Sequence, residues 1–186
     1  INHVLYTDVI ARRRKRLHAQ IAGQFEGQEP HDIDALAHHF YEAEAWAKAF
    51  QYGSAAGEEA AGNFANNRAL GLYQQALEAA QRAGKEIEPR QLLAAYERLG
   101  SAYNFLDRHQ EAEITFSRMR DTAQGLNDLE ADVRALTLLA RTRLWLYQLD
   151  VAEQTAQEAL QKGEQIDDPR LLVRSLESLI RLLIYD

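Results

Sequence analysis

YERLGSAYNFLDRHQEAEITFSRM at residues 96–119 and LTLLARTRLWLYQLDVAEQTAQEA at residues 136–159 are the two stretches that decide the fold. Each opens with large and small residues at intervals of three, one and three, which lie on one face of a helix. Each continues with three residues at intervals of four and three, on one face of a second helix. The matching positions are Tyr96, Leu99, Gly100, Tyr103, Ala112, Phe116 and Met119, and then Leu136, Leu139, Ala140, Arg143, Ala152, Ala156 and Ala159. Because the second set follows the first by about forty residues, the pattern predicts a helix–turn–helix repeat.

The pattern resembles the tetratricopeptide repeat, whose usual period is about 34 residues, and each unit here is several residues longer. The resemblance implies an all-α fold, a right-handed α-solenoid of tetratricopeptide-like helix–turn–helix repeats with about nine or ten helices. The template also fits residues 33–56, and residues 68–84 have the spacing of a second helix. Since the only partner for 68–84 is 54–63, we expect one long helix to be shared there. The first helix of a further repeat is expected at 170–185, and the array is interrupted after it, before a second helix.

Prolines, aspartates and glycines indicate the helix ends. Pro30, Pro89 and Pro169 each precede an amphipathic run, as a proline in a first helical turn does. Asp128 and Asp168 are expected to cap helix N-termini. A glycine at a helix C-terminus commonly adopts the left-handed conformation. We expect this of Gly84, Gly125 and Gly163.

The composition indicates the cellular compartment and excludes some classes of protein. The 186 residues carry a net charge of −7 and contain no cysteine, which excludes disulfides and thiolate metal sites and fits a reducing compartment. No apolar run approaches the length of a membrane span, and no signal peptide is visible. We therefore expect a cytoplasmic protein without membrane association. Because the first residue is Ile1, we expect a fragment of a longer chain.

The amino-terminal segment does not fit the repeat. It carries His3 and Leu5, a basic run at 12–16, Leu17-His18, and an ending of Ala22, Phe25 and Glu26; the stretch LAHHFY follows at 36–41. This order resembles the junction in large bacterial multidomain signalling ATPases, of the adenylyl cyclase-linked or transcriptional-regulator type, where a helix joins the ATPase region to helical repeats. The resemblance implies a connecting helix at 1–28, following an absent upstream domain, and a repeat array at 29–186. It also implies a regulatory arm without catalytic activity.

Two charged clusters have alternative interpretations. The basic run Arg12 to Arg16 could attract nucleic acid, but five consecutive residues spread around a helix in an acidic chain, so we expect a solvated helix and no nucleic-acid partner. His38 and Glu42 lie four apart, with His31 and His39 nearby, which would place two metal ligands on one face. No HExxH motif is present and a third ligand must come from elsewhere. We therefore expect polar groove or capping histidines, with no metal and no cofactor.

A repeat array contains no built-in reaction, and the sequence lacks a nucleophile elbow, a phosphate loop and a dinucleotide fingerprint. We therefore expect no enzymatic activity, and a binding site on the concave face lined by the first helices. The repeat family's inward positions predict a ligand or peptide groove at Asn104, Phe105, Arg134, Arg141, Trp145, Arg174, Arg181 and Tyr185. Arginines and aromatics together suit an anionic peptide.

The expected partner is a protein or peptide, including other domains of the same full-length chain. The alternative is a small-anion or small-ligand sensor whose groove holds the anion between arginines. The apolar residues of the last first-helix, Leu172, Leu176, Leu179, Ile180 and Leu183, also predict a homodimer through an exposed strip.

Overall fold

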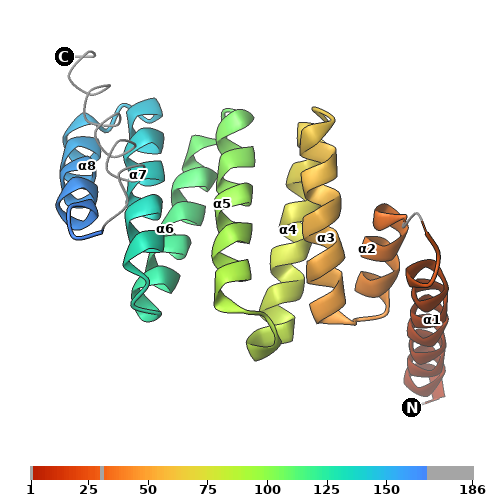
Figure 1. The fold of residues 1–186 in the computed structure, drawn as a ribbon. Helices are drawn as coiled ribbons and strands as arrows, with labels where there is room; N and C mark the ends of the chain where they lie inside the picture. Colours follow the sequence, from red (N-terminus) through yellow and green to blue (C-terminus); the bar gives the residue numbers. More distant parts are fainter. Residues whose placement is uncertain (1, 30–31, 167–186) are drawn as a thin grey trace. The chain divides into compact units, whose positions relative to one another are not determined.

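The computed structural model describes residues 2–29 and 32–166, and within these the chain is all helical, with no strand (Figure 1). Eight α-helices follow one another in this part of the chain, and a short 3₁₀-helix joins two of them. Their bounds are α1 Asn2–Glu26, α2 Ile33–Glu42, α3 Trp46–Gly62, α4 Asn66–Ala83, η1 Gly84–Glu86, α5 Pro89–Phe105, α6 His109–Gly125, α7 Leu129–Trp145 and α8 Leu149–Gly163. The all-α prediction is confirmed. The predicted helix at 170–185 lies outside the described residues.

By its contacts the chain divides into two compact units, Ile1–Glu88 and Pro89–Asp186. In the first unit α1 packs on α2, α2 on α3 and α3 on α4. The helix α3 therefore has two helical neighbours, as the sequence predicted for a shared long helix. Its contact with α4 is the most extensive, and small residues explain this: a Cβ added at Gly53 would lie 3.3 Å from the Cβ of Ala76.

In the second unit α5 packs on α6, α6 on α7 and α7 on α8, and α5 also contacts α7. Gly100 of α5 lies against the ring of Phe116 in α6, so the two backbones approach closely. The same arrangement occurs 43 residues earlier, where Gly57 of α3 lies against the ring of Tyr73. In the last helix pair, α7 and α8, small residues of both helices meet: Ala140 of α7 is fully buried in one cluster with Ala152 and Ala156 of α8. The small residues thus face the helix crossings, as the repeat template predicted.

Five helix-to-helix turns share one geometry, and this geometry was not predicted. Each contains a residue other than glycine with φ between 55° and 59°, and these residues are Glu44, Phe64, Asp107, Asn127 and Tyr147. In each, the N–H of the left-handed residue donates to the carbonyl three residues back, and the next N–H to the carbonyl five residues before it. These two bonds satisfy carbonyls that would otherwise lack a partner at the helix C-terminus.

The predicted helix ends are confirmed in part. α5 begins at Pro89, and Asp128 caps α7 by accepting a hydrogen bond from Ala131 N at 3.0 Å. Gly84 has the expected positive φ of 60°, but its ψ of −119° is not that of the left-handed helix. The prediction is wrong for Gly125 and Gly163, which do not have positive φ. After Gly125 the left-handed residue is Asn127, which lies beyond the helix, whereas Glu164 after Gly163 keeps a φ of −61°. Pro30, Pro169 and Asp168 lie outside the described residues.

None of the helices described here combines the length and the apolar character needed to cross a membrane.

Candidate functional site

The described part of the predicted groove lies in the second unit. Asn104 and Phe105 end α5, whereas Arg134, Arg141 and Trp145 lie along α7, which α5 contacts. Phe105 and Trp145 occupy equivalent positions, each the last residue of its helix and forty residues apart. The remaining predicted residues, Arg174, Arg181 and Tyr185, lie outside the described residues.

Asn104 organises one end of this surface. Its side-chain nitrogen donates to Thr142 Oγ1 at 2.8 Å, and its Oδ1 lies 2.9 Å from His109 Nδ1. Because the amide nitrogen is used toward Thr142, the amide oxygen accepts, and His109 therefore carries its proton on Nδ1. Thr142 in turn donates its hydroxyl to the carbonyl of Leu138 at 2.8 Å. Three helices, α5, α6 and α7, are joined by this chain of hydrogen bonds.

The chain of hydrogen bonds positions the imidazole of His109 against the ring of Trp145. The imidazole of His109 stacks on the indole with ring centroids 5.8 Å apart and an angle of 12° between the planes. Trp145 nevertheless remains 55% exposed, and Phe105 is 66% exposed. Large aromatic side chains held in one orientation and left in contact with water are typical of surfaces that bind a partner.

A third aromatic residue was missed by the sequence analysis. Tyr147 is 88% exposed and occupies the left-handed position of the turn after Trp145. A large side chain at such a position has no conformational advantage there, since glycine or asparagine is preferred. The forty-residue template covers helix faces only, so it assigned no role to the turns. We define the aromatic surface as the exposed residues Phe105 and Trp145, at the ends of α5 and α7, together with Tyr147 in the turn after α7.

The arginines differ in their surroundings. Arg134 is half-buried, and its Nη1 lies 3.7 Å from Glu130 Oε1 one turn earlier on α7. Arg141 is exposed. Arg143, one of the repeat positions, instead binds Glu113 through Nε at 2.8 Å and Thr155 through Nη1 at 2.5 Å. Arg143 therefore joins α6, α7 and α8.

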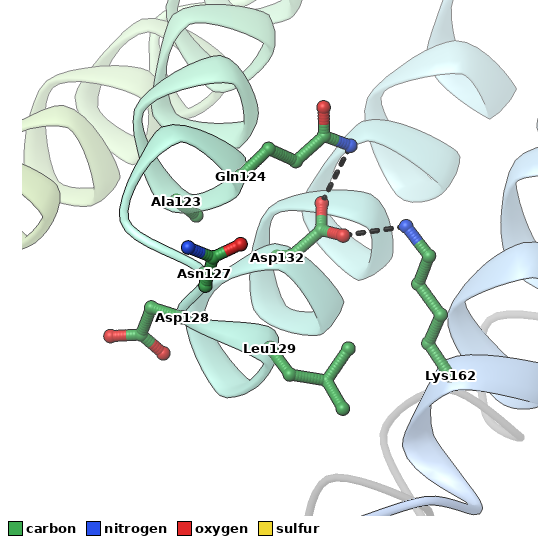
Figure 2. Close-up of a pocket in the computed structure, with 7 residues that line it drawn as sticks. All are labelled: Ala123, Gln124, Asn127, Asp128, Leu129, Asp132 and Lys162. Atoms are coloured by element: carbon green, nitrogen blue, oxygen red, sulfur yellow. Dashed lines mark hydrogen bonds and ion pairs between the residues drawn. The ribbon is translucent and has the colours of Figure 1, made fainter.

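A charged network that the sequence did not predict lies between α6, α7 and α8, and Figure 2 shows Gln124, Asp132 and Lys162 of it. Asp132 is 4% exposed, and its Oδ2 accepts from Lys162 Nζ at 2.6 Å while its Oδ1 lies 3.4 Å from both Arg120 Nε and Gln124 Nε2. Glu158 binds Arg120 and also Lys162, the latter at 2.9 Å. Burial lowers the pKa of Lys162, but its hydrogen bonds to Asp132 and Glu158 outweigh this and leave the pKa raised.

A pocket of about 360 Å³ opens beside this network. It is lined by Ala123, Gln124, Asn127, Asp128, Leu129, Asp132 and Lys162. Both oxygens of Asp132 already have partners, and Asp128 caps the start of α7. Of the charged residues that line the pocket, Asp132 and Lys162 bind each other across α7 and α8, and Asp128 caps α7, so their interactions stabilise the helices.

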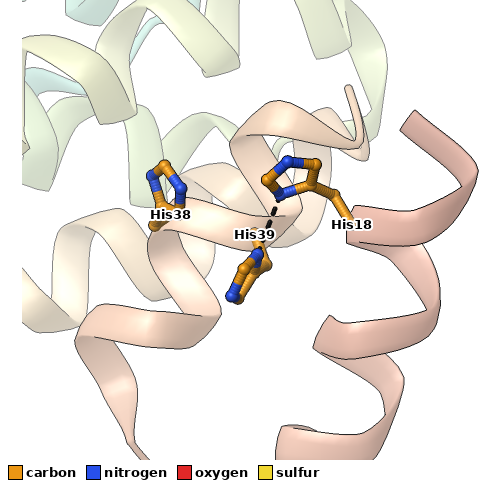
Figure 3. A group of neighbouring side chains, drawn as sticks. All are labelled: His18, His38 and His39. Carbon is orange, nitrogen blue, oxygen red and sulfur yellow. Dashed lines mark hydrogen bonds between the residues drawn. The ribbon is translucent and has the colours of Figure 1, made fainter. Parts of the chain in front are cut away.

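Three histidines of the first unit lie together between α1 and α2 (Figure 3). His18 Nδ1 lies 2.8 Å from His39 Nδ1, and one ligand nitrogen from each of His18, His38 and His39 lies within 4.8 Å of the others. The ring of His39 also stacks on Phe25, with centroids 5.9 Å apart. Partial burial lowers the pKa of His39, and the neighbouring His18 and His38 lower it further.

In the sequence, His38 and Glu42 are the pair that could share one helix face, with His31 and His39 nearby, and the expectation is that these histidines bind no metal. Within the described residues the group that forms contains His18 in place of Glu42, and His31 lies outside them. Spacing could not have identified His18, because it lies on a different helix and its position depends on how α1 packs.

No family model and no curated protein matches the chain. Among solved structures, the chain is similar to BtubC (BKLC) from P. vanneervenii, with a TM-score of 0.59 and 15% sequence identity. The match covers 95% of this chain and 66% of BtubC, so the chain spans slightly less than two thirds of that protein. At this identity the likeness concerns the fold alone.

Proposed function

We propose that this chain is a non-catalytic protein-interaction and regulatory repeat domain of a larger cytoplasmic signalling protein. In this proposal the helix pairs form a right-handed, tetratricopeptide-like array, and the partner is a protein or peptide, including another domain of the same full-length chain. The repetition of turns and helix crossings supports the array of helix pairs.

The observation that carries the proposal is the orientation of Trp145. Its ring is stacked on His109, which Asn104 holds, and yet more than half of the residue is exposed. An ordered side chain loses little conformational entropy when a partner covers it, so such a residue contributes strongly to affinity. Tryptophan is also among the residues enriched in the energetic centres of protein interfaces. We therefore place the partner over Trp145, Phe105 and Tyr147.

The test is a selection of peptides from a random display library on the immobilised chain, followed by affinity measurements with the selected peptide. A Trp46→Phe background leaves Trp145 as the one tryptophan of the chain, so binding at this surface changes its fluorescence. Trp145→Ala leaves no tryptophan in that background, so its affinity is measured by the fluorescence anisotropy of a labelled peptide. It is expected to weaken binding at least tenfold, since residues of this kind contribute about 2 kcal/mol or more.

Phe64→Ala is the matched control, because Phe64 is an aromatic residue of the first unit that is 86% exposed and outside the proposed surface. It is expected to bind the selected peptide like the wild type. The proposal would be abandoned if Trp145→Ala, Phe105→Ala and Tyr147→Ala each bound every selected peptide with unchanged affinity. Melting curves of each variant separate lost binding from lost folding.

A further inference from the structure

The histidine cluster of the first unit has a composition suited to a metal. His18 comes from α1, and His38 and His39 are consecutive residues of α2. Imidazole nitrogen is a preferred ligand of Zn²⁺ and of related divalent transition metals. Three histidines with one open position also form a known type of zinc coordination. The cluster therefore has the number and type of ligands that a zinc site requires.

The distances are close to those that a bound ion requires. Zinc binds histidine nitrogen at about 2.0–2.1 Å in tetrahedral geometry, which places two such nitrogens about 3.3 Å apart. His18 Nδ1 and His39 Nδ1 are already 2.8 Å apart, and all three ligand nitrogens lie within 4.8 Å of one another. His38 is exposed, so its ring can rotate without displacing packed neighbours. Small rotations of the side chains would complete the ligand set.

The surroundings hold two of the ligands in place. The face of His39 is stacked on Phe25 of α1, and His18 is half-buried against α2. Nearby positive charge is partly compensated, because Lys15 Nζ forms an ion pair with Glu44 Oε2 at 2.5 Å. The exposed side of the cluster, at His38, leaves a path for the ion and room for a water molecule as the fourth ligand.

We propose that His18, His38 and His39 bind one divalent transition-metal ion, Zn²⁺ in preference to a hard cation, and that this ion fastens α1 to α2. Mg²⁺ and Ca²⁺ are not expected at this site, because both ions prefer oxygen ligands to histidine nitrogen. The ion joins the helix that carries the basic run 12–16 to the start of the helix pairs. This inference is independent of the proposed peptide surface, which lies in the other unit.

The experiment is a titration of the chelator-treated, dialysed chain with ZnCl₂, followed by calorimetry and by competition with a chromophoric chelator. One Zn²⁺ per chain is expected, together with a rise in melting temperature, because an ion that binds only the folded state stabilises it. Substituting Co²⁺ should give the visible absorption of a four-coordinate ion bound by three histidines and one water molecule. MgCl₂ at the same concentration is expected to leave the melting temperature unchanged.

The variants are His18→Gln, His38→Gln and the control His109→Gln. Loss of a residue that merely orients a ligand costs about 10- to 100-fold in metal affinity, so loss of a ligand is expected to cost at least that much. His38 is exposed, so its variant keeps the fold even if His18→Gln weakens the packing of α1. His109→Gln should bind Zn²⁺ like the wild type, since His109 lies on α6.

Failure to bind Zn²⁺ at micromolar concentration would overturn the proposal. So would wild-type affinity in either His18→Gln or His38→Gln, because the site needs ligands from both helices.

Discussion

Glycines at the helix crossings show how a single methyl group decides the packing of a repeat. A Cβ added at Gly100 would lie 2.6 Å from Phe116 Cζ and 2.8 Å from Cδ1. At Gly57, an added Cβ would lie 2.6 Å from Tyr73 Cδ1. Both rings are buried, so neither can move aside without disturbing its neighbours. The aromatic rings fill the volume that the missing side chains leave.

Gly100→Ala is therefore expected to destabilise the fold by about 1–3 kcal/mol, the usual cost of adding a carbon to a packed interior. Gly71→Ala is the matched control, since a Cβ at this position in α4 meets nothing within 4 Å. It should stabilise by up to about 1 kcal/mol, because alanine is the better helix former. Urea denaturation followed by circular dichroism measures both, and a Gly100→Ala variant as stable as the wild type would contradict the packing described here.

Residue-level features could be predicted from sequence where one residue acts on its own helix. Asp128 as a cap and Pro89 as a first residue follow from local backbone chemistry, and both are confirmed. The left-handed turn residues were missed because glycine was expected to supply that conformation. In the structure, residues such as Asn127 adopt it under the hydrogen bonds of the turn.

At the scale of helices, charged side chains around the buried Asp132 hold α6, α7 and α8 together. Asp132 depends on Lys162, Arg120 and Gln124 from the two flanking helices. Removing one partner leaves a buried carboxylate with fewer hydrogen bonds, which costs more than the same change at the surface. The apolar periodicity of the helices gives no indication of this network, and that is why the sequence analysis missed it.

Lys162→Met is expected to destabilise the fold by about 1.5–3 kcal/mol, the range for a hydrogen bond to a charged group. Arg68→Met is the control, because Arg68 pairs with Asp34 where both side chains are at least half exposed; its cost should stay below about 1 kcal/mol. The folded pKa of Lys162 is raised above the ordinary 10.5, so its contribution is fully present below pH 10.5 and is lost as the pH rises through the folded pKa.

The stability difference between wild type and Lys162→Met, measured by urea denaturation at several pH values, should therefore shrink above pH 10.5. A constant difference across that range would show that the ammonium group is not the stabilising element.

At the scale of the molecule, the sequence could predict which helices pair but only part of the surface they form. The forty-residue period identified the helix pairs from α2 to α8, including the double use of α3. It also placed Phe105 and Trp145 at equivalent positions. It could not reveal His109 and Thr142, which fix Asn104 and Trp145, because these contacts depend on how neighbouring helices are rotated. The contribution of Arg174, Arg181 and Tyr185 to the groove stays a prediction.

The aromatic surface comes from α5, α7 and the turn after α7, with His109 of α6 stacked on Trp145, so the second unit should form it alone. In arrays of helix pairs each pair contacts mainly its neighbours, and stability is the sum of local terms. A fragment of residues 89–186 is therefore expected to be helical and to keep the environment of Trp145. Because Trp46 lies in the first unit, Trp145 is the one tryptophan of the fragment.

Near-ultraviolet circular dichroism measures this directly, since a tryptophan gives a strong band there only when its surroundings are fixed. The fragment should show the band of the full chain carrying Trp46→Phe. In the same fragment, His109→Ala should weaken the band, because it removes the ring that stacks on the indole at 5.8 Å. If the fragment were helical but lacked the band, Trp145 would be ordered by residues outside the second unit.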